Sequence, residues 1–291
     1  MINEKVNQET AASETTLAKG RGEISRELED EIFEKRLLQK LDCIEKLNNG
    51  RNKKNFFIVH PNHGMLYQYK ELAAELEREF IVYGLLARGL KPKGKMPENP
   101  DRMVEDYIEQ ILKVQKKGPF LISGFCGGNA VAYEITRRLE LRKHEVKALV
   151  LLDSPPVVRD GEYKFLRMLR YYPAFKRKKI MSFNMDAFER EMRANKFILK
   201  DDDDGNFRKK KVEKYMDTLV RYVFYFGFIN APIVTPQSID SPRPLATQER
   251  FDRMTRSAAT LIKVPGTHNG ILEQPYVKRL AEVIINSLEK I

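Results

Sequence analysis

Residues 120–135, "FLISGFCGGNAVAYEI", decide the fold, because a strand pattern passes directly into a helix pattern through a cluster of glycines. Four β-prone residues lead into Gly-Phe-Cys-Gly-Gly, and a helix-like run follows at once. The Gly-x-nucleophile-x-Gly spacing is typical of the nucleophile elbow, a sharp strand-to-helix turn whose central residue is usually Ser. Here the central residue is Cys126.

Cys126 has two interpretations. A free cysteine is often buried simply as a small apolar residue. At this position, however, Gly124, Gly127 and Gly128 surround the thiol, and the strand and helix patterns lie on both sides, as an elbow requires. We therefore predict that Cys126 is a nucleophile. The backbone N–H of Gly127, which follows it, is then expected to help stabilise an oxyanion.

Strand and helix patterns alternate on both sides of the elbow. The stretch 146–153, "VKALVLLD", contains a continuous apolar run over residues 148–152, which suits a parallel strand covered on both faces. This order predicts an α/β fold of the α/β-hydrolase type, with a mostly parallel sheet flanked by helices. The expected strands cover residues 55–60, 80–86, 120–123, 146–153, 231–235 and 260–264. The expected helices cover residues 67–78, 100–118 and 129–142 and the segment after Pro275.

The alternation breaks over residues 157–225, about 70 residues of helical pattern that we expect to form a lid insertion. This stretch holds 18 Lys and Arg against 11 Asp and Glu, a balance of +7 within a chain of net charge +11. Its run Asp201–Asp204 lacks the alternating ligand spacing of a calcium loop, so we predict an exposed loop and no metal site.

Three regions are expected along the chain. Residues 1–22 are polar and predicted to be disordered. Residues 23–50 are predicted to contain an N-terminal helix, with Leu37, Leu41 and Ile44 on one face and Asn48-Asn49-Gly50 as the stop. Residues 51–291 form the α/β-hydrolase domain. The sequence leaves the role of the N-terminal helix open.

Composition narrows the class of protein. The 291 residues contain no apolar run near the roughly 20 residues of a membrane span and no signal-peptide core. Two cysteines are too few for a disulfide framework, so we expect a cytoplasmic protein. The positive charge favours an acidic partner, but no zinc spacing, helix-turn-helix or RNP-like motif supports nucleic-acid binding.

A thiol nucleophile needs a base, and His268 is the predicted one. His268 lies in "KVPGTHNGILEQP", directly after the last strand pattern. In α/β-hydrolases the histidine comes last in the chain, whereas His60 and His63 precede the nucleophile. His144 lies in the charged "RKHEV" and is interpreted as a surface residue.

Two carboxylates compete to orient His268. Asp153 ends the strand pattern that follows the elbow, and Asp240 comes several residues beyond the next strand, among prolines. Either could stabilise the charged imidazole; we favour Asp153 and keep Asp240 as the alternative. The first βα turn, "HPNHG", should supply a second oxyanion donor, either the backbone N–H of Asn62 or that of His63.

Six segments taken together resemble the thioesterase domains of nonribosomal peptide and polyketide synthetases. They are "FFIVHPNHGMLYQYKELAAEL", "VYGLLARGL", "GFCGGNAVAYEI", "LVLLDSPP", "APIVT" and "VPGTHNGILEQP". The resemblance implies a domain that takes an acyl or peptidyl group from the phosphopantetheine arm of a carrier protein and releases it by hydrolysis, cyclisation or transfer. Cys126 then matches the usual Ser, Asp153 the acid and His268 the base. Some relatives take the acid from the later strand, which keeps Asp240 open.

The departures from the family shape the expected function. No carrier motif precedes the domain, so we expect a discrete enzyme that acts in trans on an acidic carrier protein, with the basic stretch 157–225 as a docking face. No cofactor is expected beyond the carrier's own arm. A Cys126 acyl-enzyme keeps thioester reactivity, which suits amide formation or ring closure, with water as the other acceptor. The alternative is a non-catalytic carrier-binding protein with a decayed site.

Overall fold

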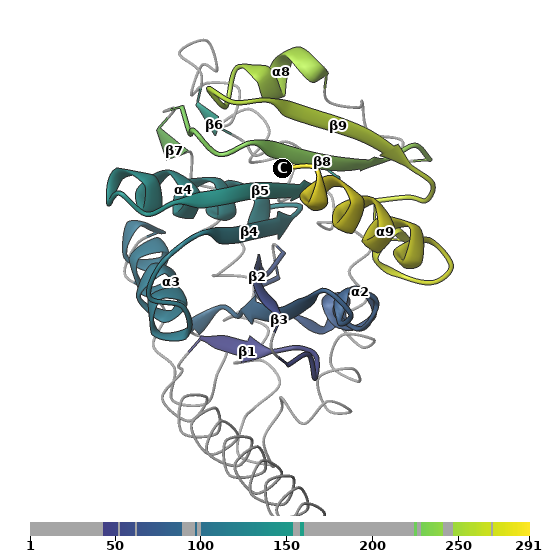
Figure 1. Cartoon of the computed structure of the whole chain (residues 1–291), viewed down its shortest axis with the longest axis horizontal. Coiled ribbons are helices and arrows are strands. Elements are labelled where there is room, and N and C mark those ends of the chain that lie inside the picture. The colour runs from purple at the N-terminus through teal and green to yellow at the C-terminus, as the bar shows by residue number, and fades with distance from the viewer. Residues whose placement is uncertain are drawn as a thin grey trace, which may run out of the picture. The chain divides into compact units, whose positions relative to one another are not determined.

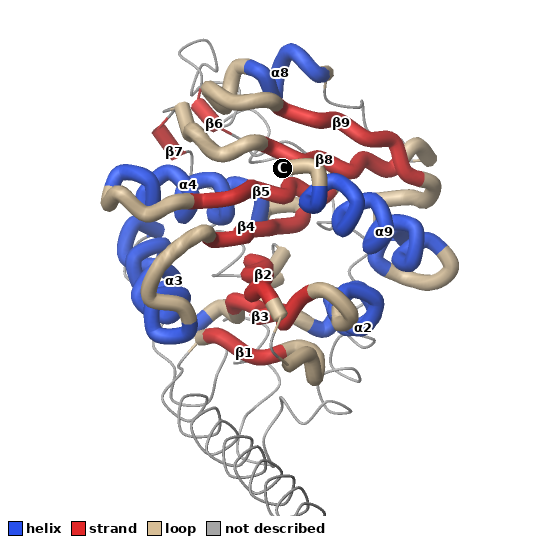
Figure 2. The backbone as a smooth tube through the Cα atoms, viewed as in Figure 1, coloured by secondary structure: helices blue, strands red, loops and turns tan. Residues whose placement is uncertain are grey.

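The structure is a computed structural model, and its central feature is a seven-stranded sheet in the order β1-β3-β2-β4-β5-β8-β9 (Figures 1 and 2). Every neighbouring pair is parallel except β1 and β3, so the predicted mostly parallel sheet is confirmed. The residues described are 43–51, 53–61, 63–88, 97, 100–153, 158–159, 224–225, 228–240, 247–268 and 270–291. The strands of the sheet are β1 (Ile44–Lys46), β2 (Lys54–Val59), β3 (Phe80–Leu85), β4 (Phe120–Phe125), β5 (Val146–Leu152), β8 (Ile233–Ser238) and β9 (Ala259–Val264).

Helices cover both faces of this sheet. Figure 1 shows α3 and α4 on one face and α2 and α9 on the other, the arrangement that right-handed βαβ crossovers produce. In α3 one stripe of side chains, at Met103, Tyr107 and Ile111, is buried. The described helices are η1 (Tyr67–Tyr69), α2 (Lys70–Leu76), α3 (Pro100–Val114), α4 (Gly128–Leu141), α8 (Gln248–Asp252), η3 (Gly270–Leu272) and α9 (Tyr276–Glu289).

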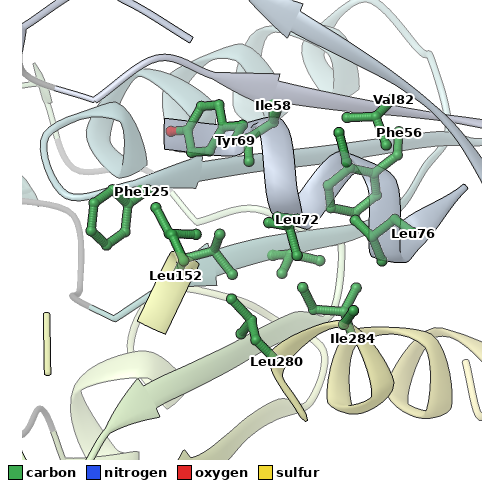
Figure 3. Packing of buried hydrophobic residues seen from close by; sticks show 14 of the residues in the cluster. Phe56, Ile58, Tyr69, Leu72, Leu76, Val82, Phe125, Leu152, Leu280 and Ile284 are labelled. Atoms are coloured by element: carbon green, nitrogen blue, oxygen red, sulfur yellow. The ribbon is translucent and has the colours of Figure 1, made fainter. Parts of the chain in front are cut away.

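One large cluster of core residues lies between the sheet and the pair α2 and α9 (Figure 3). Alternate residues of the strands point to this face and meet apolar residues of the two helices, such as Leu72 of α2 and Ile284 of α9. Phe125 and Leu152, at the carboxyl ends of β4 and β5, belong to the same cluster. The core therefore continues up to the sheet edge at which the predicted site residues lie.

The predicted helix over residues 23–50 is wrong at its carboxyl end. Residues 44–46 form β1, which pairs antiparallel with β3 through the register Ile44–Leu85. Asn48, interpreted above as a helix stop, donates its side-chain amide to the carbonyls of Ala73 and Phe80 and accepts from the N–H of Val82. Pairing with the open edge of β3 thus overrides the helical periodicity. The remaining predictions for residues 1–42 lie outside the described residues.

Only the two ends of the predicted lid insertion are described. β6 (Val158–Arg159) and β7 (Phe224–Tyr225) pair in parallel and form a separate two-stranded sheet. The pairing brings the start and the end of residues 157–225 side by side, as an insertion into one connection of the sheet requires. The helices predicted within this stretch, and Asp201–Asp204, lie outside the described residues.

Candidate active site

The predicted elbow has the local geometry of a strand-to-helix turn. β4 ends at Phe125, α4 begins at Gly128, and Cys126 between them has φ +55°. A non-glycine residue in this left-handed region carries backbone strain, which is common at functional turns. The turn is closed by hydrogen bonds from the N–H of Asn129 to the Cys126 carbonyl, 3.2 Å, and from that of Ala130 to the Gly127 carbonyl, 3.3 Å. The thiol is thereby placed at the carboxyl edge of the central strand, and it is partly exposed.

Gly128 allows the start of α4 to approach β2 closely. A Cβ on this residue would clash with the carbonyl oxygen of His60 and would lie 2.9 Å from that of Val59. Gly124 also lies close to the backbone of Gly128. A Cβ on Gly124 would lie 2.6 Å from the carbonyl oxygen of Gly128. Two of the glycines in the motif therefore bring the elbow against the turn that leaves β2.

Asp153 occupies the corresponding edge position on the neighbouring strand. It follows β5 directly and has φ +61°. Its N–H donates to the Pro236 carbonyl at 2.8 Å, and its Oδ1 accepts the N–H of Ser238 at 2.5 Å. Its Oδ2 is hydrogen-bonded to Nδ1 of His268. The carboxylate is buried, with 2% of the side chain exposed. Its hydrogen bonds to Ser238 and His268 hold it in one orientation.

The imidazole of His268 is fixed on two sides. Its Nδ1 contacts Asp153, and because an ionised carboxylate only accepts hydrogen bonds, Nδ1 carries the proton and the lone pair of a neutral imidazole lies on Nε2. Its ring stacks on that of Phe125, with centroids 4.6 Å apart and an angle of 25° between the planes. Phe125 is the residue before Cys126, so the stacking brings the predicted base over the end of the strand that carries the predicted nucleophile.

Asp240 has a different position from the one its alternative role requires. Its Oδ2 accepts the N–H of Gly266 at 2.9 Å, and its own N–H donates to the Gly266 carbonyl at 3.1 Å. Gly266 has φ +110°, a conformation that suits glycine. Asp240 therefore ties the end of β8 to the loop that carries His268, while Asp153 contacts the imidazole itself.

Of the first βα turn, the structure describes all residues except Asn62, the predicted oxyanion donor. The N–H of Gly64 donates to the Pro61 carbonyl at 2.9 Å, and the N–H of Ala87 donates to the Gly64 carbonyl at 2.9 Å. His63, the alternative donor, is buried: its Nδ1 accepts the N–H of Met65, and its Nε2 is bonded to Gln68. The turn lies beside the elbow because Gly128 packs against the carbonyls of Val59 and His60.

His60 and His63 are neutral in the folded protein. Burial lowers the pKa of His60 to about 3 and that of His63 to about 4. The Nδ1 of His60 lies 2.6 Å from the Pro61 carbonyl, and its Nε2 lies 2.7 Å from the Tyr107 hydroxyl. Both rings are engaged with residues around the first turn, in agreement with their exclusion as the base.

These two histidines predict a pH dependence of stability. Both stay neutral in the fold down to about pH 4, whereas an unfolded histidine takes up a proton near pH 6.5. The unfolded chain therefore binds more protons below pH 6.5, and the free energy of unfolding should fall by up to about 1.4 kcal/mol per pH unit for each histidine. Urea denaturation at pH 7.5, 6.5 and 5.5 measures this slope. His63→Gln should flatten it, and equal slopes in the two proteins would contradict the assignment.

Tyr69 contributes to the site and was missed from the sequence. The side chain is fully buried, and its hydroxyl donates to the Val59 carbonyl at 2.7 Å. Burial raises the pKa of Tyr69 well above its usual value, and an ionised Cys126 would raise it further. Tyr69 belongs to the apolar cluster against which Cys126 packs. Its only signal in the sequence is an aromatic residue near the start of a predicted helix, which more often indicates core packing.

The described residues contain no group of three or more His, Cys, Asp and Glu side chains suited to hold a metal ion. Among them, no helix is both long and apolar enough to cross a membrane. His144, interpreted above as a surface residue, packs its ring edge-on against Phe120 at the start of β4, away from the site. The other cysteine, Cys43, is buried next to β1.

The sheet order, the helices on both faces and the elbow after β4 make this an α/β-hydrolase fold. Solved structures share it: a Vlm2 thioesterase domain, described as bound with a dodecadepsipeptide, superposes with a TM-score of 0.63 over 84% of this chain and 96% of that one, at 20% identity. The family model of the thioesterase domain matches residues 54–171, which include the elbow and Asp153.

Two curated relatives match part of the chain. A dimodular nonribosomal peptide synthase of Bacillus subtilis is 35% identical over 116 residues, which are 40% of this chain and 5% of that protein. An atromentin synthetase of Serpula lacrymans is 34% identical over 122 residues, which are 42% of this chain and 13% of that protein. The similarity thus covers a small part of each relative. It supports a thioesterase domain of the kind found in such synthetases.

Proposed function

We propose that this protein transfers an acyl group from the phosphopantetheine thioester of a carrier protein through an acyl-enzyme on Cys126, with a Cys-His-Asp triad. The observation that carries the proposal is the contact between Asp153 and His268 at the sheet edge where Cys126 forms the elbow. The thioesterase match and the synthetase relatives support product release in peptide synthesis as the general role. The matched relatives also support a carrier protein as the partner.

In the proposed acylation, Cys126, His268 and Asp153 each have a separate chemical role. The Nε2 of His268 takes the proton from the Cys126 thiol, and Asp153 stabilises the imidazolium through Nδ1. The sulfur attacks the thioester carbonyl. The oxyanion that develops there accepts hydrogen bonds from the backbone N–H groups of Gly127 and Asn62. The intermediate collapses, the C–S bond to pantetheine breaks, and the leaving thiolate takes the proton from His268. The products are the Cys126 thioester and the free pantetheine thiol.

The second half reaction transfers the acyl group to water or an amine. His268 removes a proton from the acceptor as it attacks the Cys126 thioester, and the proton then returns to the leaving sulfur. Exchange of one thioester for another costs little free energy, and the acyl-enzyme stays reactive toward amines. Cys126 therefore suits amide formation or ring closure, while hydrolysis remains the outcome when water is the acceptor. An acidic carrier is the expected partner of the basic stretch 157–225.

The proposal is tested with acyl-pantetheine thioesters and intact-protein mass spectrometry. The expected result is a mass increase of one acyl group, mapped by peptide digestion to Cys126. Cys43 is a control within the same chain, because it is a buried thiol away from the elbow, and Cys43→Ala should leave the adduct unchanged. Amines added after acylation then reveal the preferred acceptor. Carrier binding without adduct or thioester consumption across a broad acyl panel would refute the proposal and favour the non-catalytic alternative.

A further inference from the structure

The loop that carries His268 contains a glycine on each side of the histidine. Gly266 lies two residues before the base and Gly270 two residues after it. Glycine has more backbone freedom than any other residue, so this segment could adopt several conformations. The contacts with Asp153 and Phe125 hold the imidazole ring itself. Restraint of the backbone on either side of the ring must come from other contacts.

The ring of Tyr276, the first residue of α9, lies against both glycines. A Cβ on Gly266 would lie 3.0 Å from Cγ and 3.2 Å from Cδ2 of this ring. A Cβ on Gly270 would lie 3.9 Å from Cδ2 and 4.0 Å from Cε2. One aromatic side chain therefore packs on the backbone both before and after the base. The close approach at Gly266 leaves no room for a side chain at that position.

The start of α9 is anchored to a neighbouring helix, so the tyrosine ring has a fixed base. The N–H of Gln274 donates to Oε2 of Glu71 at 2.8 Å, and its side-chain amide donates to Oε1 of Glu75 at 3.1 Å. Both glutamates belong to α2. The N–H of Tyr276 donates to the Glu273 carbonyl at 2.9 Å. Further along, α9 packs into the core cluster.

We propose that Tyr276 is a positioning residue for the base: by packing on the two glycines of the loop, its ring keeps Nε2 of His268 within reach of the Cys126 thiol. The inference rests on the proposed function, since it assumes that His268 activates Cys126. Asp240 restrains the same loop before the histidine, at Gly266, whereas the tyrosine ring contacts the backbone on both sides. Tyr276 thus acts through the loop and needs no contact with substrate.

Tyr276→Ala removes the ring, and acylation of Cys126 by an acyl-pantetheine thioester tests its role. At pH 7.5 we expect the rate to fall about tenfold or more, because small displacements of a reacting group are costly. At pH 9.5 the loss should shrink to within about threefold, since an ordinary thiol, with a pKa of about 8.5, ionises there without a base. Mass spectrometry of the adduct measures both rates. A side chain that only supported the fold would lower both rates by the same factor.

Three further variants control for packing and folding. Tyr276→Phe keeps the ring and should retain most of the acylation rate. Tyr276→Leu keeps apolar bulk but has no flat ring to cover both glycines, so it should lose activity severalfold at pH 7.5 even if the alanine variant is unstable. Ile285→Ala truncates another partly buried side chain of α9, roughly 13 Å further along the helix, and should leave the rate within about twofold of wild type.

The outcomes separate this inference from the proposed function. Equal rates for wild type and Tyr276→Ala at pH 7.5, or an equal loss at both pH values, would overturn the role of the ring and leave the proposed function intact. A loss in Tyr276→Phe as large as that in Tyr276→Ala would do the same. Alkylation by iodoacetamide at pH 9.5 reports whether the thiol is accessible. A wild-type Cys126 that is alkylated but never acylated would refute both proposals.

Discussion

Replacing Cys126 by alanine is expected to abolish the covalent adduct and to lower thioester turnover by at least about a thousandfold, the scale on which loss of a nucleophile acts in triad enzymes. The reason is local. Cys126 is the partly exposed residue held at φ +55° between β4 and α4, and its sulfur is the group expected to attack the substrate. Adduct formation and pantetheine release are measured on the same samples. Turnover that persists in Cys126→Ala would assign the chemistry to another group.

The variant Cys126→Ser tests the role of the sulfur atom itself. A serine at this turn would place a hydroxyl where the thiol was, and the backbone donors of the site are unchanged. We expect slow hydrolysis through an oxygen ester and a sharp fall in the fraction of product captured by amines, since oxygen esters react much less readily with amines. Product ratios at a fixed amine concentration measure this. Complete loss of activity would show that the site requires a thiol, and an unchanged product ratio would contradict the role given to sulfur.

Asp153→Asn is expected to lower turnover by roughly a thousandfold to ten-thousandfold, as the equivalent change does in serine proteases. Its amide oxygen could still accept the N–H of Ser238. The amide nitrogen would then face Nδ1 of His268 as a donor, which forces the ring proton onto Nε2. The imidazole would have no lone pair left for the thiol. Single-turnover acylation is the appropriate measurement, because product release cannot mask the effect.

Asp240→Asn is the matched control. An asparagine oxygen can still accept the N–H of Gly266, so the loop that carries His268 should keep its position. The expected change in the acylation rate is about threefold or less. If Asp240→Asn lost far more activity than Asp153→Asn, the acid would have to be reassigned to the later strand.

The sequence was sufficient for the elements that have a local signature. The strand pattern 146–153 predicted β5, and the elbow motif predicted the junction of β4 and α4 to within a few residues. It failed at Ile44, because a helical spacing of three apolar residues says nothing of the open edge of β3 nearby. α8 was also missed; at five residues it is too short to carry a periodicity.

Contacts between distant segments could not be predicted. The sequence named Asp153 and His268 as candidates, but the donor from Ser238 and the ring of Phe125 that hold them became visible only in three dimensions. Tyr69 depends on the packing of a turn against an elbow in the same way. The role of such a residue depends on its neighbours in space, and a single sequence does not show which residues those are.

The partners of Asp153 have a consequence for biosynthesis of the chain. Pro236, Ser238 and His268, the three residues that hold this aspartate, all follow it by more than 80 positions. During translation, Cys126 and Asp153 leave the ribosome long before any of them. The growing polypeptide therefore carries the thiol well before the base and its orienting contacts exist. In the proposed mechanism, the thiol gains its base only when β8 and the loop that carries His268 have joined the sheet.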